Sequence, residues 1–289
     1  MGLDLKYLTK PAILKFIDAA LKEDIEDGDH SSLGSIPSDL IHEAKLLIKD
    51  DGIIAGLSLA KWIFARLDKT LEVDLLLKDG DHVRSGDVGL TVKGKARSIL
   101  SAERLVLNCL QRMSGIATYT NKMTTLLDGT SVKILDTRKT TPNFRLMEKW
   151  AVKIGGAENH RFGLYDMVML KDNHVDYAGG IKKAITSTQE YLKRNKKDLK
   201  IEIETRNIEE VKEVLAVGGV DIIMLDNMLP SVMKEALQLI GKKYKTEASG
   251  GITEKNIRDM ADTGVDFISV GALTHSYKSL DISLKAVKK

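Results

Sequence analysis

The sequence contains a single cysteine, Cys109, among its 289 residues. One thiol cannot form an intramolecular disulfide, so the chain is compatible with a reducing compartment, and we expect it in the cytoplasm. The surrounding residues, VLNCLQRM, are typical of a helix interior, which predicts a small buried side chain rather than a reactive thiol. No histidines and cysteines stand at the spacing of a zinc site.

Long apolar runs and a large net charge are also missing. No stretch approaches the ~18 uncharged residues that indicate a membrane span. The first 25 residues carry scattered charges and predict an amphipathic helix with Pro11 in its first turn, not a signal peptide. The balance of 44 basic and 41 acidic residues leaves a net charge of +3, so any positive field must be local, and nucleic acid is not implied.

The N-terminal third changes character along its length. An acidic loop is expected over residues 23–32, and residues 42–100 read as short strands with Asp-Gly and Ser-Gly turns around a helix at 60–67. The piece KDGDHVRSGDVGLTVKG resembles lipoyl or biotinyl carrier domains, in which a modified lysine protrudes from a tight hairpin. A carrier module modified at Lys93 is therefore an alternative function, although the flanking residues of those families are missing.

A helix is predicted over residues 101–128, with one polar face. Arg104, Asn108, Gln111 and Arg112 recur at helical spacing and share that face. Such a stripe can be the solvent side of the helix or a contact with a ligand or partner, and the spacing leaves both interpretations open.

From residue 130 onward strands and helices alternate. The strand candidates are VKILDT, DMVMLK, KIEIET, DIIMLD, KTEAS and FISVGA, and helices are expected at 179–194, 207–217, 230–241 and 254–263. This alternation predicts an α/β fold with a parallel sheet covered by helices. Six strands are too few for a closed eight-stranded barrel, so we expect an open, incomplete barrel.

Basic residues follow the first two of these strands. Arg138 and Lys139 follow the first, Lys171 closes the second, and the segment between them adds Arg145, Lys149, Lys153, His160 and Arg161. Because parallel sheets bind ligands beyond the carboxyl ends of their strands, the segment predicts a cationic rim for an anionic ligand. Lys171 could instead form a Schiff base, as in an aldolase-like barrel.

The later strands end in carboxylates and glycines. Glu202 and Glu204 lie on one face of their strand, and Asp226 closes the next, which suggests Mg²⁺, with pairing to nearby lysines and arginines as the competing explanation. The segments SGGIT and SVGAL close the last two strands, where exposed backbone N–H groups can hold a phosphate.

Several motifs in fixed order resemble the quinolinate phosphoribosyltransferase family. They are ERLVLNCLQRMSGIAT, LDTRKTTPNFR, HRFGLYDMVMLKDNH, IEIET, IIMLDN, EASGGIT and ISVGALTH, and the similarity runs from LKEDIEDGD to LDISL. The resemblance implies an N-terminal α/β sandwich domain, residues 1–114, and an open α/β barrel of the type II phosphoribosyltransferase kind, residues 115–275, with residues 276–289 returning to the first domain. It also implies transfer of phosphoribose from phosphoribosyl pyrophosphate to quinolinate, giving nicotinate mononucleotide, pyrophosphate and CO₂. A related paralogue that uses another acceptor is the alternative.

The resemblance also implies roles for individual residues, with Lys139, Lys171, Glu204 and Asp226 as the catalytic group. Glu204 and Asp226 would hold the ribose hydroxyls and Mg²⁺. Arg104 would reach into the site of a neighbouring subunit, so a homodimer would be the smallest active unit. The groups that receive the acceptor carboxylates and the donor phosphates would be Thr137, Arg138, Lys139, His160, Arg161, Lys171, Ser249, Gly250, Gly251, Val270, Gly271 and Ala272.

Overall fold

The computed structural model describes residues 5–287. Within this range the chain forms two compact units. The first contains the chain up to Lys122, then Thr140–Gly156 and the chain from Leu273 onward, and the second contains Met123–Lys139 and Ala157–Ala272. This grouping by contacts does not test the predicted division after residue 114, which stays a prediction; helix α4 (Ala96–Thr125) runs through that point without a break.

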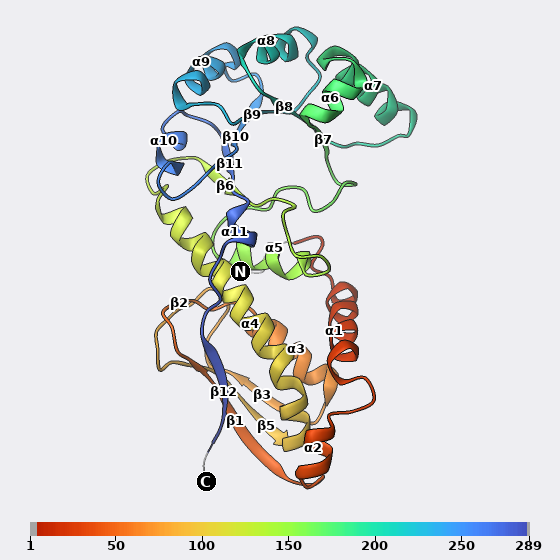
Figure 1. Cartoon of the computed structure of the whole chain (residues 1–289), viewed down its shortest axis with the longest axis vertical. Coiled ribbons are helices and arrows are strands. Elements are labelled where there is room, and N and C mark those ends of the chain that lie inside the picture. Colours follow the sequence, from red (N-terminus) through yellow and green to blue (C-terminus); the bar gives the residue numbers. More distant parts are fainter. Residues whose placement is uncertain (1–4, 288–289) are drawn as a thin grey trace. The chain divides into compact units, whose positions relative to one another are not determined.

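The first unit is built on an antiparallel sheet with the strand order β12-β1-β5-β3 (Figure 1). Strand β12 (Ile282–Ala286) pairs along β1 (Ile41–Ile48), so the last strand joins the sheet that the N-terminal strands form. The remaining elements before α4 are α1 (Lys10–Ile25), α2 (His30–Ser35), β2 (Gly52–Ile53), α3 (Leu57–Leu67), β3 (Glu72–Leu75), β4 (His82–Val83) and β5 (Val88–Lys95).

Helix starts in this unit follow capping chemistry. The predicted helix at Pro11 is α1, and the Thr9 side chain accepts a hydrogen bond from the Ala12 N–H at 3.3 Å. The loop predicted over residues 23–32 is shorter than expected, because α2 begins inside it. The Asp29 carboxylate caps α2 by accepting from the Ser32 N–H at 3.1 Å.

Two predictions about single residues in the first unit can be compared with the structure. Cys109 lies on α4 with 2% of its surface exposed, which confirms a buried side chain, and burial raises the pKa of its thiol to about 12. Lys93 lies within β5 and pairs in register with Glu43 and Glu72, so it does not sit at a hairpin tip as a carrier lysine must. Among residues 5–287, no helix combines the length and apolar character needed to cross a membrane.

The second unit contains the six-stranded sheet that the sequence predicts. All its strands are parallel, in the order β6-β11-β10-β9-β8-β7, and β6 and β7 are the two edges, so the sheet does not close. This confirms the incomplete barrel. The strands are β6 (Lys133–Leu135), β7 (Val168–Leu170), β8 (Ile201–Thr205), β9 (Ile222–Asp226), β10 (Lys245–Ser249) and β11 (Phe267–Ser269).

Helices alternate with these strands, as predicted. They are α6 (Asp172–Ala178), α7 (Ile181–Arg194), α8 (Ile208–Val217), α9 (Pro230–Ile240), α10 (Ile257–Ala261) and α11 (Ala272–His275). In Figure 1, α6 to α10 lie along one side of the row of strands. One further helix, α5 (Arg145–Ile154), belongs to the first unit. The cationic segment predicted from the sequence was therefore too broad. Arg145, Lys149 and Lys153 lie on α5 and not at strand ends, because this stretch folds as a helix.

Candidate active site

The carboxyl ends of the six parallel strands meet at one edge of the second unit. We call this edge the rim. The register places Asp226, the last residue of β9, beside Ser249, the last residue of β10. Glu204 on β8 is aligned with Met224 of β9, two residues before Asp226. Carboxylates and glycine-bearing ends that are distant in sequence therefore come together at the rim.

An acidic pair, Glu204 and Asp226, lies at the centre of the rim. Glu204 is 8% exposed, and its Oε2 lies 3.5 Å from the Lys171 Nζ. Burial raises the pKa of Glu204, the charges of Asp226 and Asp172 raise it further, and Lys171 opposes them. The pair is thus short of positive charge, which is a setting for a cation or for hydroxyl donors. The Lys171 side chain is half exposed and paired with a carboxylate, so it lacks the apolar burial that activates a Schiff-base lysine.

The end of β10 has a left-handed backbone. Gly250 and Gly251 have φ angles of +94° and +61°. A Cβ on Gly250 would lie 2.5 Å from the Asn227 Cγ and 2.9 Å from its backbone nitrogen. Asn227 is itself at φ +54°, donates its N–H to the Ser249 carbonyl at 2.8 Å, and donates Nδ2 to Asp226 Oδ2 at 2.6 Å. Asn227 therefore connects the glycine end of β10 to Asp226 of the acidic pair through its hydrogen bonds and its close approach to Gly250.

The end of β11 offers backbone rather than side chains. The Val270 side chain is buried, and its N–H donates to the Leu135 carbonyl at 2.9 Å, which ties β11 to β6. Gly271 and Ala272, at the start of α11, are half-buried.

A cationic pair consists of Arg138, which follows β6, and Arg161, which precedes β7, and both side chains are half-buried. Arg161 Nη1 donates to the Met167 carbonyl at 3.1 Å. Burial lowers the pKa of Arg161, and the charge of Arg138 lowers it further, so the two guanidinium groups repel each other. Lys139 is exposed, and its N–H donates to the Thr137 hydroxyl at 3.0 Å. Two like charges held together in this way favour an anion between them.

Comparisons with known proteins agree with this arrangement. The family models for the N-terminal and C-terminal domains of quinolinate phosphoribosyl transferase match residues 29–114 and 116–285. The chain belongs to the quinolinate phosphoribosyltransferase family. A quinolinate phosphoribosyltransferase [decarboxylating] from Nicotiana tabacum is 49% identical over 93% of this chain and 81% of its own length. A probable nicotinate-nucleotide pyrophosphorylase [carboxylating] from Bacillus subtilis is 44% identical, covering 93% of this chain and 92% of its own. The crystal structure of NadC from Streptococcus pyogenes, 38% identical, superposes with a TM-score of 0.90 over 99% of this chain and 100% of that one.

In this member of the quinolinate phosphoribosyltransferase family, a buried triad stands beside the cationic pair. The triad consists of His160, Glu202 and Glu247. The His160 Nε2 lies 3.0 Å from Glu202 Oε2 and 3.5 Å from Glu247 Oε2, and the two glutamates have no exposed surface. Burial lowers the pKa of His160, but the carboxylates outweigh it and raise the pKa to about 9. The ligand atoms lie within 4.8 Å of one another, so the triad could also hold a metal ion.

Two aspartates that organise the loops of the site were not recognised as such from the sequence. Asp136 follows β6, is fully buried, and accepts from Asn159 Nδ2 at 2.7 Å and from the His160 N–H at 2.8 Å. Asp166 accepts from the N–H groups of Phe162 and Gly163 at 2.6 and 2.8 Å. An aspartate just outside a strand or three residues after a glycine is the signal that could have identified them.

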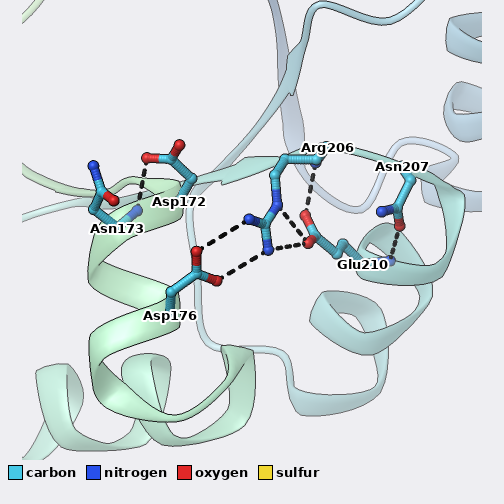
Figure 2. Close-up of polar contacts among 6 residues, drawn as sticks. All are labelled: Asp172, Asn173, Asp176, Arg206, Asn207 and Glu210. Carbon is cyan, nitrogen blue, oxygen red and sulfur yellow. Dashed lines mark hydrogen bonds and ion pairs between the residues drawn. The ribbon is translucent and has the colours of Figure 1, made fainter.

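An arginine at the end of β8 connects two elements of the rim. Figure 2 shows Arg206 between Asp176 of α6 and Glu210 of α8. Its Nη1 and Nη2 each lie 3.2 Å from an Asp176 oxygen, and its Nε lies 2.8 Å from Glu210 Oε1. Since α6 starts directly after Lys171 and Arg206 stands two residues after Glu204, this bridge holds together the elements that carry the Lys171–Glu204 contact.

The polar face of α4 is divided between two kinds of role. Gln111 Nε2 donates to the Ile282 carbonyl at 2.8 Å, and Arg112 Nε donates to the buried Glu148 at 2.9 Å, so both serve the interior of the first unit. Arg104 and Asn108 are exposed.

Proposed function

We propose that this chain catalyses the transfer of phosphoribose from phosphoribosyl pyrophosphate to quinolinate, with loss of CO₂ and pyrophosphate, to give nicotinate mononucleotide. The observation that carries the proposal is the charge pattern at the rim. Arg138, after the end of β6, forms a cationic pair with Arg161, and Glu204 and Asp226 form an acidic pair beside the left-handed glycine end of β10. A dianionic acceptor and a phosphorylated sugar need these two kinds of group together. The names of the family relatives support the same reaction.

The acceptor half of the site consists of cations. We assign the quinolinate carboxylates to Arg138 and Arg161, with Lys139, His160 and Lys171 around them and Thr137 at the edge. The repulsion between the two guanidinium groups supports this assignment, because a dianion would relieve it. The guanidinium fork also matches the planar geometry of a carboxylate.

The donor half consists of carboxylates and backbone. We assign the ribose hydroxyls to Glu204 and Asp226 and the phosphate to Ser249, Gly250, Gly251, Val270, Gly271 and Ala272. The same carboxylates fit Mg²⁺, because two neighbouring acidic side chains are the protein ligands this ion takes alongside phosphate and water. When bound, Mg²⁺ would neutralise charge on the pyrophosphate leaving group.

The reaction needs no strong base. The quinolinate nitrogen forms the bond to the ribose carbon as the bond to pyrophosphate breaks, and positive charge develops on the sugar. Glu204 and Asp226 would stabilise that charge, while Lys139 and Lys171 would hold the departing phosphates. The quaternised ring then accepts the electron pair of the breaking carbon–carboxylate bond as CO₂ leaves, and that carbon takes a proton from water.

We further propose that Arg104 completes the site of a partner subunit, so the active unit is a homodimer, and that the enzyme works in the cytoplasm. The exposure of Arg104 on α4 supports the first point, and the single, buried thiol supports the second. The test mixes two inactive proteins, Arg104→Ala and Lys171→Ala. In a 1:1 mixture of exchanging dimers about a quarter of the sites are intact, so activity should recover to about that fraction. No recovery, with subunit exchange verified, would contradict the shared site.

The reaction itself is tested with purified protein, phosphoribosyl pyrophosphate and Mg²⁺. Quinolinate is the test acceptor and nicotinic acid the control. We expect nicotinate mononucleotide from quinolinate and not from nicotinic acid, because only quinolinate carries two carboxylates for the cationic pair. Turnover of nicotinic acid at an equal rate, or of neither acceptor, would reject the proposal.

A further inference from the structure

The buried triad raises a question that the proposed reaction leaves open. Glu202 and Glu247 are fully buried carboxylates, and their only close cationic neighbour within residues 5–287 is the His160 imidazole, at 3.0 and 3.5 Å. Burying two poorly compensated carboxylates is unfavourable, because each loses its hydration. A fold that needed only a stable core would place apolar side chains here.

The other edge of the imidazole faces the acceptor half of the site. The Arg161 N–H donates to His160 Nδ1 at 2.6 Å, which requires a lone pair on Nδ1 and favours the neutral ring with its proton on Nε2. The carboxylates favour the doubly protonated ring instead. In both forms Nε2 carries a proton and stays at ion-pair distance from Glu202 and Glu247, so the two carboxylates attract this edge of the ring whichever form is present.

The backbone of His160 and the side chain of Arg161 are also held by hydrogen bonds. The His160 N–H donates to Asp136 at 2.8 Å, and the Arg161 guanidinium reaches the Met167 carbonyl at 3.1 Å. The imidazole is therefore the link between the buried carboxylates and the peptide that carries Arg161. The charge of Glu202 also acts on Arg161 in the direction opposite to that of Arg138.

We propose that Glu202 and Glu247 are positioning residues for acceptor binding, which hold the His160 imidazole and through it set the Arg161 guanidinium beside Arg138. The inference rests on the proposed function, since it takes the cationic pair as the receptor of the acceptor carboxylates. It assigns a role to two buried glutamates, of which Glu202 stands two residues before Glu204 on β8 and Glu247 two residues before Ser249 on β10.

The direction of the effect separates positioning from charge alone. Glu202→Gln keeps the shape of the side chain and removes a negative charge near the acceptor site. If Glu202 acted only through its charge, its removal would attract the dianionic acceptor more strongly and lower KM. If Glu202 positions the ring, KM for quinolinate should rise about tenfold, which is the effect of losing one charge-assisted contact. KM for phosphoribosyl pyrophosphate should stay within about twofold. Glu202→Asp keeps the charge but withdraws the carboxylate, so positioning predicts a raised KM there too.

The experiment measures kcat and both KM values for Glu202→Gln, Glu202→Asp and Glu247→Gln, together with calorimetric binding of quinolinate. Asp266→Asn is the matched control, since Asp266 stabilises the opposite, amino-terminal end of β10 by accepting from the Thr246 N–H at 2.9 Å. It should lower Tm without changing either KM. In the His160→Ala background, Glu202→Gln should add less than about a twofold change, because its effect passes through the ring.

Three outcomes overturn the inference while leaving the reaction intact. These are an unchanged or lower KM for quinolinate in both Glu202 variants, full additivity with His160→Ala, and a divalent metal that copurifies with the wild type and is lost in Glu202→Gln. If a Glu202 variant does not fold, the Glu247→Gln variant and its quinolinate binding decide the question. A wild-type enzyme that does not turn over quinolinate would instead reject the proposed function.

Discussion

The glycine end of β10 gives the sharpest test of the donor half, by three alanine substitutions. Gly251 and Gly241 share a φ of +61°, and an added Cβ would meet nothing within 4 Å at either. Gly241 lies at the end of α9, away from the rim. Gly250 has a φ of +94°, and its added Cβ would press on Asn227 at 2.5 Å from Cγ. Gly241→Ala therefore tests backbone strain alone, Gly251→Ala adds the effect on ligand approach, and Gly250→Ala adds a steric clash.

The stability cost follows from these geometries. An alanine at positive φ costs about 1–3 kcal/mol, so Gly241→Ala and Gly251→Ala should each lose stability of that order. Gly250→Ala adds an overpacking cost of about 1–3 kcal/mol, because the Asn227 backbone cannot yield without moving Asp226. At about 2–4 °C per kcal/mol, the first two variants should melt about 5 °C lower and Gly250→Ala about 10 °C lower.

The kinetic costs should follow a different order. Gly251→Ala should raise KM for phosphoribosyl pyrophosphate about 10- to 100-fold, the loss of one hydrogen bond to a charged group, because its Cβ would keep the phosphate from the backbone. Gly241→Ala should change neither KM, and the KM for quinolinate should stay within about twofold in both. Melting curves and steady-state kinetics of the three proteins give the answer. If Gly251→Ala raises KM no more than Gly241→Ala does, the glycine end does not hold the phosphate.

Three further predictions concern other parts of the chain. Cys109 should not react with a thiol reagent in the native protein, because burial raises its pKa to about 12, and should react fully in denaturant; native reaction would show that α4 opens. Arg206→Ala should lower Tm slightly and raise KM for phosphoribosyl pyrophosphate, and Arg206→Lys should not restore the ion pairs to both Asp176 and Glu210. As a control, Arg258→Ala, which removes the exposed ion pair with Asp262, should leave KM unchanged. Hydrogen bonds from Thr70 and Ser98 lower the pKa of Asp68 below 3.8, so its stabilisation is present above about pH 4 and is lost as pH falls through the lowered pKa. Calorimetry should therefore find Asp68→Asn less stable at pH 7, with the difference vanishing in acid; a constant difference would contradict this.

Much of the second unit was predictable because each of its strands is an apolar run bounded by charge or glycine. The runs ending at Leu135, Leu170 and Asp226 became β6, β7 and β9 within a residue or two. The grouping of segments by contacts was harder to predict. Helical periodicity continues smoothly through residue 114, and tertiary contacts group residues 115–122 and α5 with the first unit.

The site shows the same contrast. Residues that close a strand, such as Lys171 and Asp226, were predicted because parallel topology brings strand ends together whatever the sequence between them. The role of Glu247 was missed because a lone charge inside a strand gives no hint of its partner. Glu247 stands two residues before Ser249, so the two side chains lie on the same face of β10. Its partner His160 lies on a loop whose path depends on the hydrogen bond to Asp136. Long-range pairs of this kind need the fold before they can be seen.

The central claim is that one rim joins a dianionic acceptor to a phosphoribosyl donor and then releases CO₂. The most direct measurement is the release of labelled CO₂ from quinolinate carrying the label in its 2-carboxylate, followed with and without phosphoribosyl pyrophosphate. We expect release only when the donor is present, with one CO₂ for each nicotinate mononucleotide formed, because the ring must be quaternised before the carboxylate can leave. Release without the donor, or nicotinate mononucleotide formed without labelled CO₂, would contradict it.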